Sequence, residues 1–201
     1  MKIIMTELEE DIMNLFLGLN IHKPNEIDIW RIAEELDVWI HHYSEESKTT
    51  KFNGSYYILL NDELSPQEEF QDFAHELGHI IRHVGNQHKL RVAFRELQEH
   101  QANNFMYQFC VPTYMLQNYE IINYYNIEDG VPIIAKDFNV TEEFARKRLI
   151  QLRNKIQQAK LDEKHREFME SLYPKAPPYS KETNKVLNRL QAILNKKGAT
   201  R

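Results

Sequence analysis

The chain has 201 residues, of which 42% are hydrophobic, 30 are acidic, 25 are basic and one is cysteine. This composition excludes a disordered or fibrous protein and allows one core with an appendage, while the lone cysteine excludes an internal disulfide and a cysteine-rich zinc site. Because no apolar run reaches eighteen residues and the acidic start lacks a signal-peptide core, we expect a cytoplasmic protein without a membrane partner.

The charge is unevenly distributed along the chain. Residues 175–201 carry seven Lys or Arg and one Glu, a net charge of +6, whereas the remainder carries 18 basic and 29 acidic residues, a net charge of −11. An acidic body disfavours phosphate binding, so any contact with nucleic acid would come from the basic tail. We therefore do not expect direct nucleic-acid binding.

The first third of the chain predicts two helices followed by strands. Apolar residues recur at helical spacing over residues 6–19 and 27–36, whereas residues 38–43 and 51–61 are strand-like, with a tight turn or bulge at Asn53-Gly54. We expect these strands to form a small antiparallel sheet. The adjacent His41 and His42 would point to opposite faces, so they cannot chelate one metal together.

The strand over residues 56–61 has two interpretations. A peptidase holds its substrate extended, and an exposed strand edge would fix the scissile carbonyl without demanding particular side chains. Alternatively, the strand is covered and contributes only to the core.

The next helix carries the residues on which the functional hypothesis depends. Ser65 as N-cap and Glu68 three residues later predict a capping box at its start, and we expect the helix to end near Gly85. His75 and His79 lie four residues apart on one face, where two imidazoles can hold one Zn²⁺ and Glu76 can act as the general base. The alternative is a plain amphipathic helix whose polar side faces water.

A catalytic zinc needs a third protein ligand from another element. Residues 91–111 predict a second helix, whose apolar face we assign to Phe94, Leu97, Ala102, Phe105, Met106 and Phe109. Of its candidate donors Glu96, Glu99 and His100, only Glu99 lies at the edge of that face, so we expect it to be the ligand. Asn103, one turn later, could hydrogen-bond a ligating imidazole.

The donor for the developing oxyanion is not identified by the sequence. Tyr56, His83 and His100 are the candidates. His83 lies one turn beyond His79 and His88 follows in the loop, and both are better explained as solvated polar residues.

Three runs together resemble the ImmA/IrrE family of zinc metallopeptidases: Ala-His-Glu-Leu-Gly-His at 74–79, Glu-His-Gln-Ala-Asn-Asn-Phe at 99–105 and Cys-Val-Pro at 110–112. The resemblance covers roughly residues 8–153, and only Met106, where the family usually has Ala, departs from the pattern. It implies a gluzincin-like endopeptidase with one Zn²⁺ per chain. It also implies a protein substrate, a helix-turn-helix repressor of a phage-like or mobile element, whose cleavage derepresses the element's genes.

Residues 132–149 predict two short helices joined at Asn139-Val140, with Thr141 capping the second. One interpretation is a DNA-reading helix-turn-helix that uses its basic side chains, namely Arg146, Lys147, Arg148 and Arg153. The family resemblance instead implies scaffold or substrate contact. After three prolines, residues 182–195 predict a short amphipathic helix, which should dock on the body or on a partner.

The sequence thus predicts an α+β fold, mainly helical, with a small antiparallel sheet beside the zinc helix. We expect a metallopeptidase core over residues 1–127, a helical segment over 128–173 packed on it, and a linker with a basic tail helix over 174–201. The alternatives to a repressor-cleaving peptidase are a non-cleaving regulator that binds its repressor and, more remotely, a DNA-binding regulator. A general base at Glu76 favours the enzyme, because a pure binder does not need one.

Overall fold

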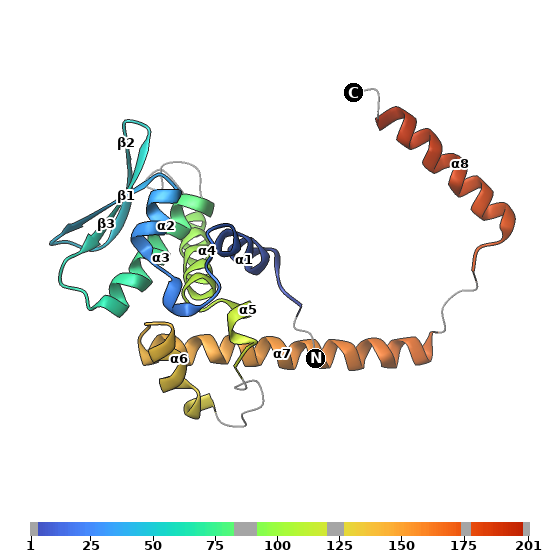
Figure 1. Cartoon of the computed structure of the whole chain (residues 1–201). Helices are drawn as coiled ribbons and strands as arrows, with labels where there is room; N and C mark the ends of the chain where they lie inside the picture. The colour runs from blue at the N-terminus through green and yellow to red at the C-terminus, as the bar shows by residue number, and fades with distance from the viewer. Residues whose placement is uncertain (1–3, 83–91, 120–126, 174–177, 199–201) are drawn as a thin grey trace. The chain divides into compact units, whose positions relative to one another are not determined.

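The computed structural model describes residues 4–82, 92–119, 127–173 and 178–198 (Figure 1). The chain divides into two compact units, residues 1–157 and 158–201. Most described residues are helical. The α-helices are α1 (Glu7–Gly18), α2 (Ile29–Glu35), α3 (Pro66–Arg82), α4 (Val92–Cys110), α5 (Thr113–Leu116), α6 (Val131–Asp137), α7 (Glu142–Leu172) and α8 (Lys181–Gly198), with short 3₁₀ turns η1 (Pro24–Glu26) and η4 (Ile127–Asp129). The expected α+β class is confirmed.

The sheet is mixed, and the expected antiparallel pairing is wrong for its first strand. Its strands are β1 (Val38–Tyr43), β2 (Lys48–Phe52) and β3 (Ser55–Asn61), in the order β1-β3-β2. β2 and β3 form an antiparallel hairpin, whereas β1 runs parallel to β3. The chain leaves β1 and enters β2 on the far side of β3, so β1 and β3 run in the same direction.

The turn at Asn53-Gly54 joins β2 to β3. Both residues have positive φ, 50° and 93°, as the two central positions of a type I′ hairpin turn require. Of the two possibilities that the sequence left open, a tight turn and a bulge, the structure has the turn. β2 begins at Lys48, three residues before the strand-like run that the sequence predicts from residue 51.

The helix α3 begins as predicted. The Oγ of Ser65 accepts a hydrogen bond from the backbone N–H of Glu68 (3.4 Å), and the Glu68 carboxylate accepts one from the backbone N–H of Ser65 (3.0 Å). This capping box satisfies two backbone donors at the helix start. The predicted end near Gly85 lies outside the described residues.

The core lies between α1, the sheet and the antiparallel pair α3 and α4 (Figure 1). Its largest buried side chains include Phe16, Ile58, Leu60, Phe73 and Phe109. Cys110 is also fully buried, and burial raises the pKa of its thiol well above the usual value. This inert environment excludes a catalytic thiol. Among the described helices, none is long and apolar enough to cross a membrane.

The apolar face of α4 is shorter than the sequence predicted. Ala102, Phe105 and Phe109 are buried, but Phe94 and Leu97 are 58% and 50% exposed. The apolar pattern therefore begins earlier along α4 than the contacts that this helix makes with the described core.

The helix-turn-helix-like segment differs from the prediction in one element. Asn139 adopts a left-handed conformation between α6 and α7, and the Oγ1 of Thr141 accepts a hydrogen bond from Phe144 N–H, as expected for the cap. α7, however, has 31 residues and is not a short helix.

Arg148 of α7 is fully buried, so it is not a surface cation. Its guanidinium donates to the backbone oxygen of Val111 (2.9 Å) and to Oγ1 of Thr113 (2.7 Å). Thr113 donates in turn to the buried carboxylate of Glu9 (2.5 Å), which also pairs with Lys155. Burial lowers the pKa of Arg148 to about 10, and Glu9 opposes this change. The network connects α1, α5 and α7.

Candidate metal centre

Two imidazoles of α3 converge on one point. The spacing of four residues stacks His75 above His79 on the same helix face, and their Nε2 atoms lie 3.1 Å apart. His79 is 5% exposed, whereas His75 lies at the opening of the cleft. Their rings meet nearly edge to face, at 80°. Two ring nitrogens thus point at a common centre.

The third donor comes from α4. The carboxylate of Glu99 lies 3.3 Å from Nε2 of His75 through Oε2, and 3.6 Å from Nε2 of His79 through Oε1. Among the described residues, these three side chains form a group whose donor atoms lie within 4.8 Å of one another. The structure therefore brings together the three ligands that the sequence predicted.

The spacing of these donors fits zinc. Ligands about 2.05 Å from a tetrahedral zinc are about 3.3 Å from one another, which is close to the three observed distances of 3.1, 3.3 and 3.6 Å. Two imidazoles and one carboxylate also match the donor set of a catalytic zinc, which leaves a fourth position open. The residues present therefore fit the ion.

Gly78 allows α3 and α4 to approach closely enough for this arrangement. A Cβ built at Gly78 would lie 3.2 Å from Cα of Ala102 and 3.2 Å from Cδ1 of Phe105. Ala102 is one turn beyond Glu99 on α4, so the contact lies beside the metal ligands. Since a glycine inside a helix costs about 1 kcal/mol relative to alanine, close packing is a physical reason for this residue.

The general-base candidate Glu76 is buried between α3 and the sheet, with 7% of its surface exposed. Burial raises the pKa of Glu76 to about 7, with a further increase from Asp72 and Glu99 and an opposing hydrogen bond from the backbone N–H of Thr49. A dication at the neighbouring imidazoles would oppose this increase, because it favours the carboxylate. A carboxylate in such surroundings can both accept and return a proton near neutral pH.

A cleft of about 440 Å³ opens beside this group. It is lined by residues of α3, α4, the end of β3 and the connections before β2 and before α3: Glu46, Ser47, Asn61, Leu64, Asp72, His75, Glu76, Asn103 and Met106. The lining is largely polar, with Leu64 and Met106 as its apolar members. A peptide in this cleft would reach both His75 and Glu76.

The remaining predicted residues lie in different places. Asn103 is exposed and lines the cleft, and no described hydrogen bond joins its amide to either imidazole. His100 lines a second, shallower cavity beside Glu99. Tyr56 lies outside the lining of both cavities and accepts a hydrogen bond from Lys51 (3.4 Å). His83 and His88 lie outside the described residues.

The proposed substrate shelf on β3 is wrong. β3 is the central strand, paired on one side with β1 and on the other with β2, so neither edge is free for a peptide. The alternative interpretation, a covered strand of the core, is correct, since Ile58 and Leu60 are fully buried. The edge strand β2 contributes the Thr49 N–H to Glu76, which lines the cleft.

His41 and His42 take separate roles on the two faces of the sheet, as the sequence predicted. His42 pairs with Glu69 of α3 (2.9 Å), whereas His41 stacks on Tyr57. Neither belongs to the metal group.

Asp72, Glu46 and Thr49 also lie at the site, although the sequence pattern does not predict them there. Asp72 precedes Glu76 by one helical turn, so its proximity could have been inferred from helical spacing. Glu46, in the β1–β2 connection, lines the cleft, and Thr49 of β2 hydrogen-bonds Glu76; both reach the site only because of the strand order.

Two helices hold two histidines and a glutamate around one point, beside a buried glutamate, and this is the set of groups that a metallopeptidase site needs. A family model for the IrrE N-terminal-like domain, Peptidase_M78, matches residues 28–150. The chain belongs to this family of zinc-type metallopeptidases.

Two relatives from Bacillus subtilis (strain 168) are similar over most of the chain. The phage-like element PBSX protein XkdA is 45% identical over 145 residues, which is 72% of this chain and 72% of that protein. The uncharacterized protein YqaB is 36% identical over 149 residues, or 74% of this chain and 86% of that protein.

The fold also resembles that of a solved Mycobacterium tuberculosis transcriptional regulator, with a TM-score of 0.52 and 12% sequence identity. The likeness covers 69% of this chain but only 44% of that protein. At this identity it concerns the fold alone.

Proposed function

We propose that this protein is a zinc-dependent endopeptidase that cuts a helix-turn-helix repressor of a phage-like or mobile element. The observation that carries the proposal is the spacing of the three donor atoms of His75, His79 and Glu99, with the buried Glu76 beside them. Membership of a metallopeptidase family supports the reaction class.

His75, His79 and Glu99 would hold the ion. When bound, zinc supplies Lewis acidity, which polarises a carbonyl group and makes water easier to deprotonate. Glu76 takes the proton from the attacking water and transfers it to the leaving amine. Its burial keeps bulk water away from this proton, and Thr49 N–H fixes the orientation of its carboxylate. The donor to the developing oxyanion is unassigned, and His100 is the remaining described candidate beside Glu99.

The substrate would lie extended between the cleft and β2. In the described part of the chain, β2 pairs only with β3, which leaves its outer edge available to a peptide. Thr49 of this strand already contacts Glu76, so a peptide along β2 would present its carbonyl groups near the general base.

The choice of a repressor as substrate rests on similarity. The relative XkdA belongs, by its name, to the phage-like element PBSX, and the family resemblance implies cleavage of the repressor that silences such an element. A folded repressor has exposed segments between domains that can be held extended in a cleft. One cut there would separate DNA binding from dimerisation.

The direct test is co-expression with the repressor encoded by the same element. We expect the wild type to shorten the repressor on a gel, and Glu76→Gln to leave it intact. Glu69→Gln, on the same helix but paired with His42, is the matched control and should behave as wild type. An intact repressor in all three samples, bound to the protein, would instead indicate a non-cleaving regulator.

The DNA-binding alternative has less support. Arg148 is buried, Arg146 pairs with Glu128 (2.9 Å) and Lys147 pairs with Glu143 (2.8 Å). Three of the four basic side chains that a DNA-reading helix would use are therefore already engaged. A structural role, as part of the scaffold, explains α6 and the first part of α7 better than a DNA-reading role does.

A further inference from the structure

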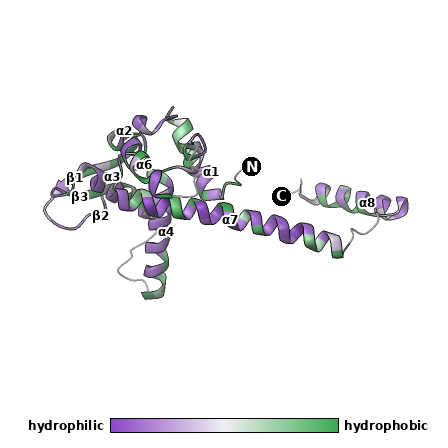
Figure 2. Ribbon diagram, turned by 90° about the horizontal axis from the view of Figure 1, so that it is seen from below, coloured by the Kyte–Doolittle hydropathy of each residue, from purple (hydrophilic) through white to green (hydrophobic). Residues whose placement is uncertain are grey.

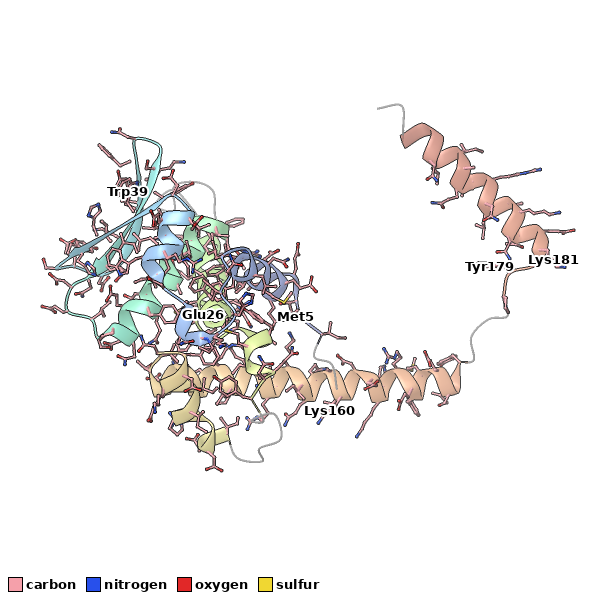
Figure 3. The ribbon with its side chains drawn as sticks, in the orientation of Figure 1. Met5, Glu26, Trp39, Lys160, Tyr179 and Lys181 are labelled. Atoms are coloured by element: carbon pink, nitrogen blue, oxygen red, sulfur yellow. The ribbon has the colours of Figure 1, made fainter. Side chains whose placement is uncertain are left out.

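The second unit, residues 158–201, carries two apolar helix faces without a partner among the described residues. On α7 they are Leu161, Phe168, Met169 and Leu172, and on α8 they are Val186, Leu187, Leu190, Ile193 and Leu194. These nine side chains are between 39% and 65% exposed. Nearby polar side chains such as Lys160 and Lys181 project from the same helices (Figure 3).

Each set falls on one face of its helix. At about 100° per residue, the α7 residues cover an arc of about 100° and the α8 residues an arc of about 120°. Both helices carry hydrophobic and hydrophilic residues along their length (Figure 2). His165 also lies within the α7 arc, as a polar member of the face. Apolar residues scattered at random would not align in this way. Each aligned face is therefore suited to packing against another helix.

The width of the faces decides how many neighbours each helix needs. A two-stranded coiled coil uses a narrow seam, whereas a helix in a bundle presents a face of about 100° or more to two neighbours. If α7 and α8 of one chain packed only on each other, part of each face would stay exposed. A second copy supplies the two further helices of a four-helix bundle.

Length, charge and area fit this arrangement. The free part of α7, residues 158–172, is about 22 Å long and α8 about 27 Å. Residues 158–172 carry four acidic and three basic side chains, whereas residues 181–198 carry five basic and one acidic. If each half-exposed side chain offers roughly 100 Å², a bundle of two copies would bury on the order of 1,800 Å² of apolar surface within and between the copies, comparable to the burial in a standard stable interface.

We propose that residues 158–198 form a dimerisation module, in which α7 and α8 of two copies of this chain pack as a four-helix bundle. The module lies beyond the peptidase family domain, which ends at residue 150. Its formation is therefore separate from the chemistry of the metal centre. A basic amphipathic helix alone could also bind an anionic membrane, but residues 158–172 of α7 carry a net charge of −1 beside their apolar face, which favours a protein partner.

The test is the molar mass of the full-length chain in solution, by size-exclusion chromatography with light scattering. The wild type should have twice the mass of one chain at about 50 μM. Leu187→Glu with Leu190→Glu on α8, and separately Leu161→Glu with Phe168→Glu on α7, should give single chains. Asn188→Glu with Asn195→Glu adds the same charge to the opposite face of α8 and should leave the dimer intact.

These substitutions lie on exposed residues of the second unit, so the first unit should keep its thermal transition, which checks that the variants fold. A wild type that is monomeric at 100 μM would overturn the proposal, as would a dimer that survives both pairs of substitutions. So would co-flotation of a monomeric wild type with vesicles of phosphatidylcholine and phosphatidylglycerol, which would assign α8 to a membrane surface.

Discussion

Glu99 completes the metal group, because its position on α4 directs its carboxylate toward α3. Its two carboxylate oxygens face the two imidazoles of α3. Glu96, one turn earlier on the same helix, belongs to the shallower cavity beside the site and not to the metal group. The two residues therefore form a matched pair for a test.

We expect Glu99→Gln to weaken zinc binding by at least about 100-fold, because removal of a partner that merely orients a ligand already costs 10- to 100-fold. Glu96→Gln should retain the affinity of the wild type. Competition with a chromophoric zinc chelator measures both. Equal affinities in the two variants would show that Glu99 does not bind the ion.

For single residues, the sequence predicts the relative placement of the donor side chains where one helix determines it. The spacing of His75 and His79 fixes their common face, and the helical angle of Glu99 selects it over Glu96 and His100. The same reasoning fails where separate elements meet. Thr49 reaches Glu76 through the strand order, which no local pattern contains.

The metal centre requires α3 and α4 to pack closely on each other. Gly78 lies at a close approach of the two helices, and two of the three atoms nearest to a Cβ built there are backbone atoms of Ala102. Backbone of a packed helix cannot move aside alone, so an added methyl group would displace α4 and its ligand Glu99.

We expect Gly78→Ala to lower zinc affinity by about tenfold, on the order of the effect of disturbing a ligand's support. Gly18→Ala, in α1, places a methyl group in open space and should leave zinc affinity unchanged. Isothermal titration with zinc compares the two. If Gly78→Ala binds zinc as the wild type does, the close approach is not needed for the site.

The buried network of Glu9, Thr113 and Arg148 joins α1 to α5 and α7. Burial would raise the pKa of Glu9, but hydrogen bonds from Lys155, Thr113 and the Thr6 backbone outweigh it, so the pKa lies below the usual value. A carboxyl group with a lowered pKa contributes stability above its unfolded pKa of 4.5, and this stability is lost as the pH falls through the folded value.

We therefore expect the wild type to lose stability as the pH falls below about 4.5, and Glu9→Gln to lose less over the same range. The variant should be less stable than the wild type at pH 7, because it removes the charge that Lys155 and Arg148 face. Urea unfolding at a series of pH values measures this. Parallel pH profiles for the two proteins would contradict the assignment.

Several elements were predictable, and others were not, for identifiable reasons. The capping box at Ser65 and the turn at Asn53-Gly54 are local signals. The length of α7 could have been inferred, because no Gly or Pro interrupts residues 142–172. The burial of Arg148 could also have been predicted from the sequence, because Arg148 shares one helix face with Phe144, Leu149 and Leu152. The parallel pairing of β1 is set by tertiary packing.

At the scale of the whole molecule, the peptidase family domain and the basic tail belong to different parts of the chain. The family match ends at residue 150, and the net positive charge lies beyond residue 174. The acidic first unit surrounds a site with several carboxylates and suits a dication better than a phosphate. This division is consistent with a chain that binds its metal in one unit and associates through the other.

The most direct test of the central claim uses purified, zinc-loaded protein and purified repressor, analysed by intact mass. We expect two fragments whose masses together equal the repressor plus one water. They should disappear with a chelator, return with added zinc, and form about 100- to 10,000-fold more slowly with Glu76→Gln. An uncut repressor with the zinc-loaded wild type, or equal cutting by Glu76→Gln, would contradict it.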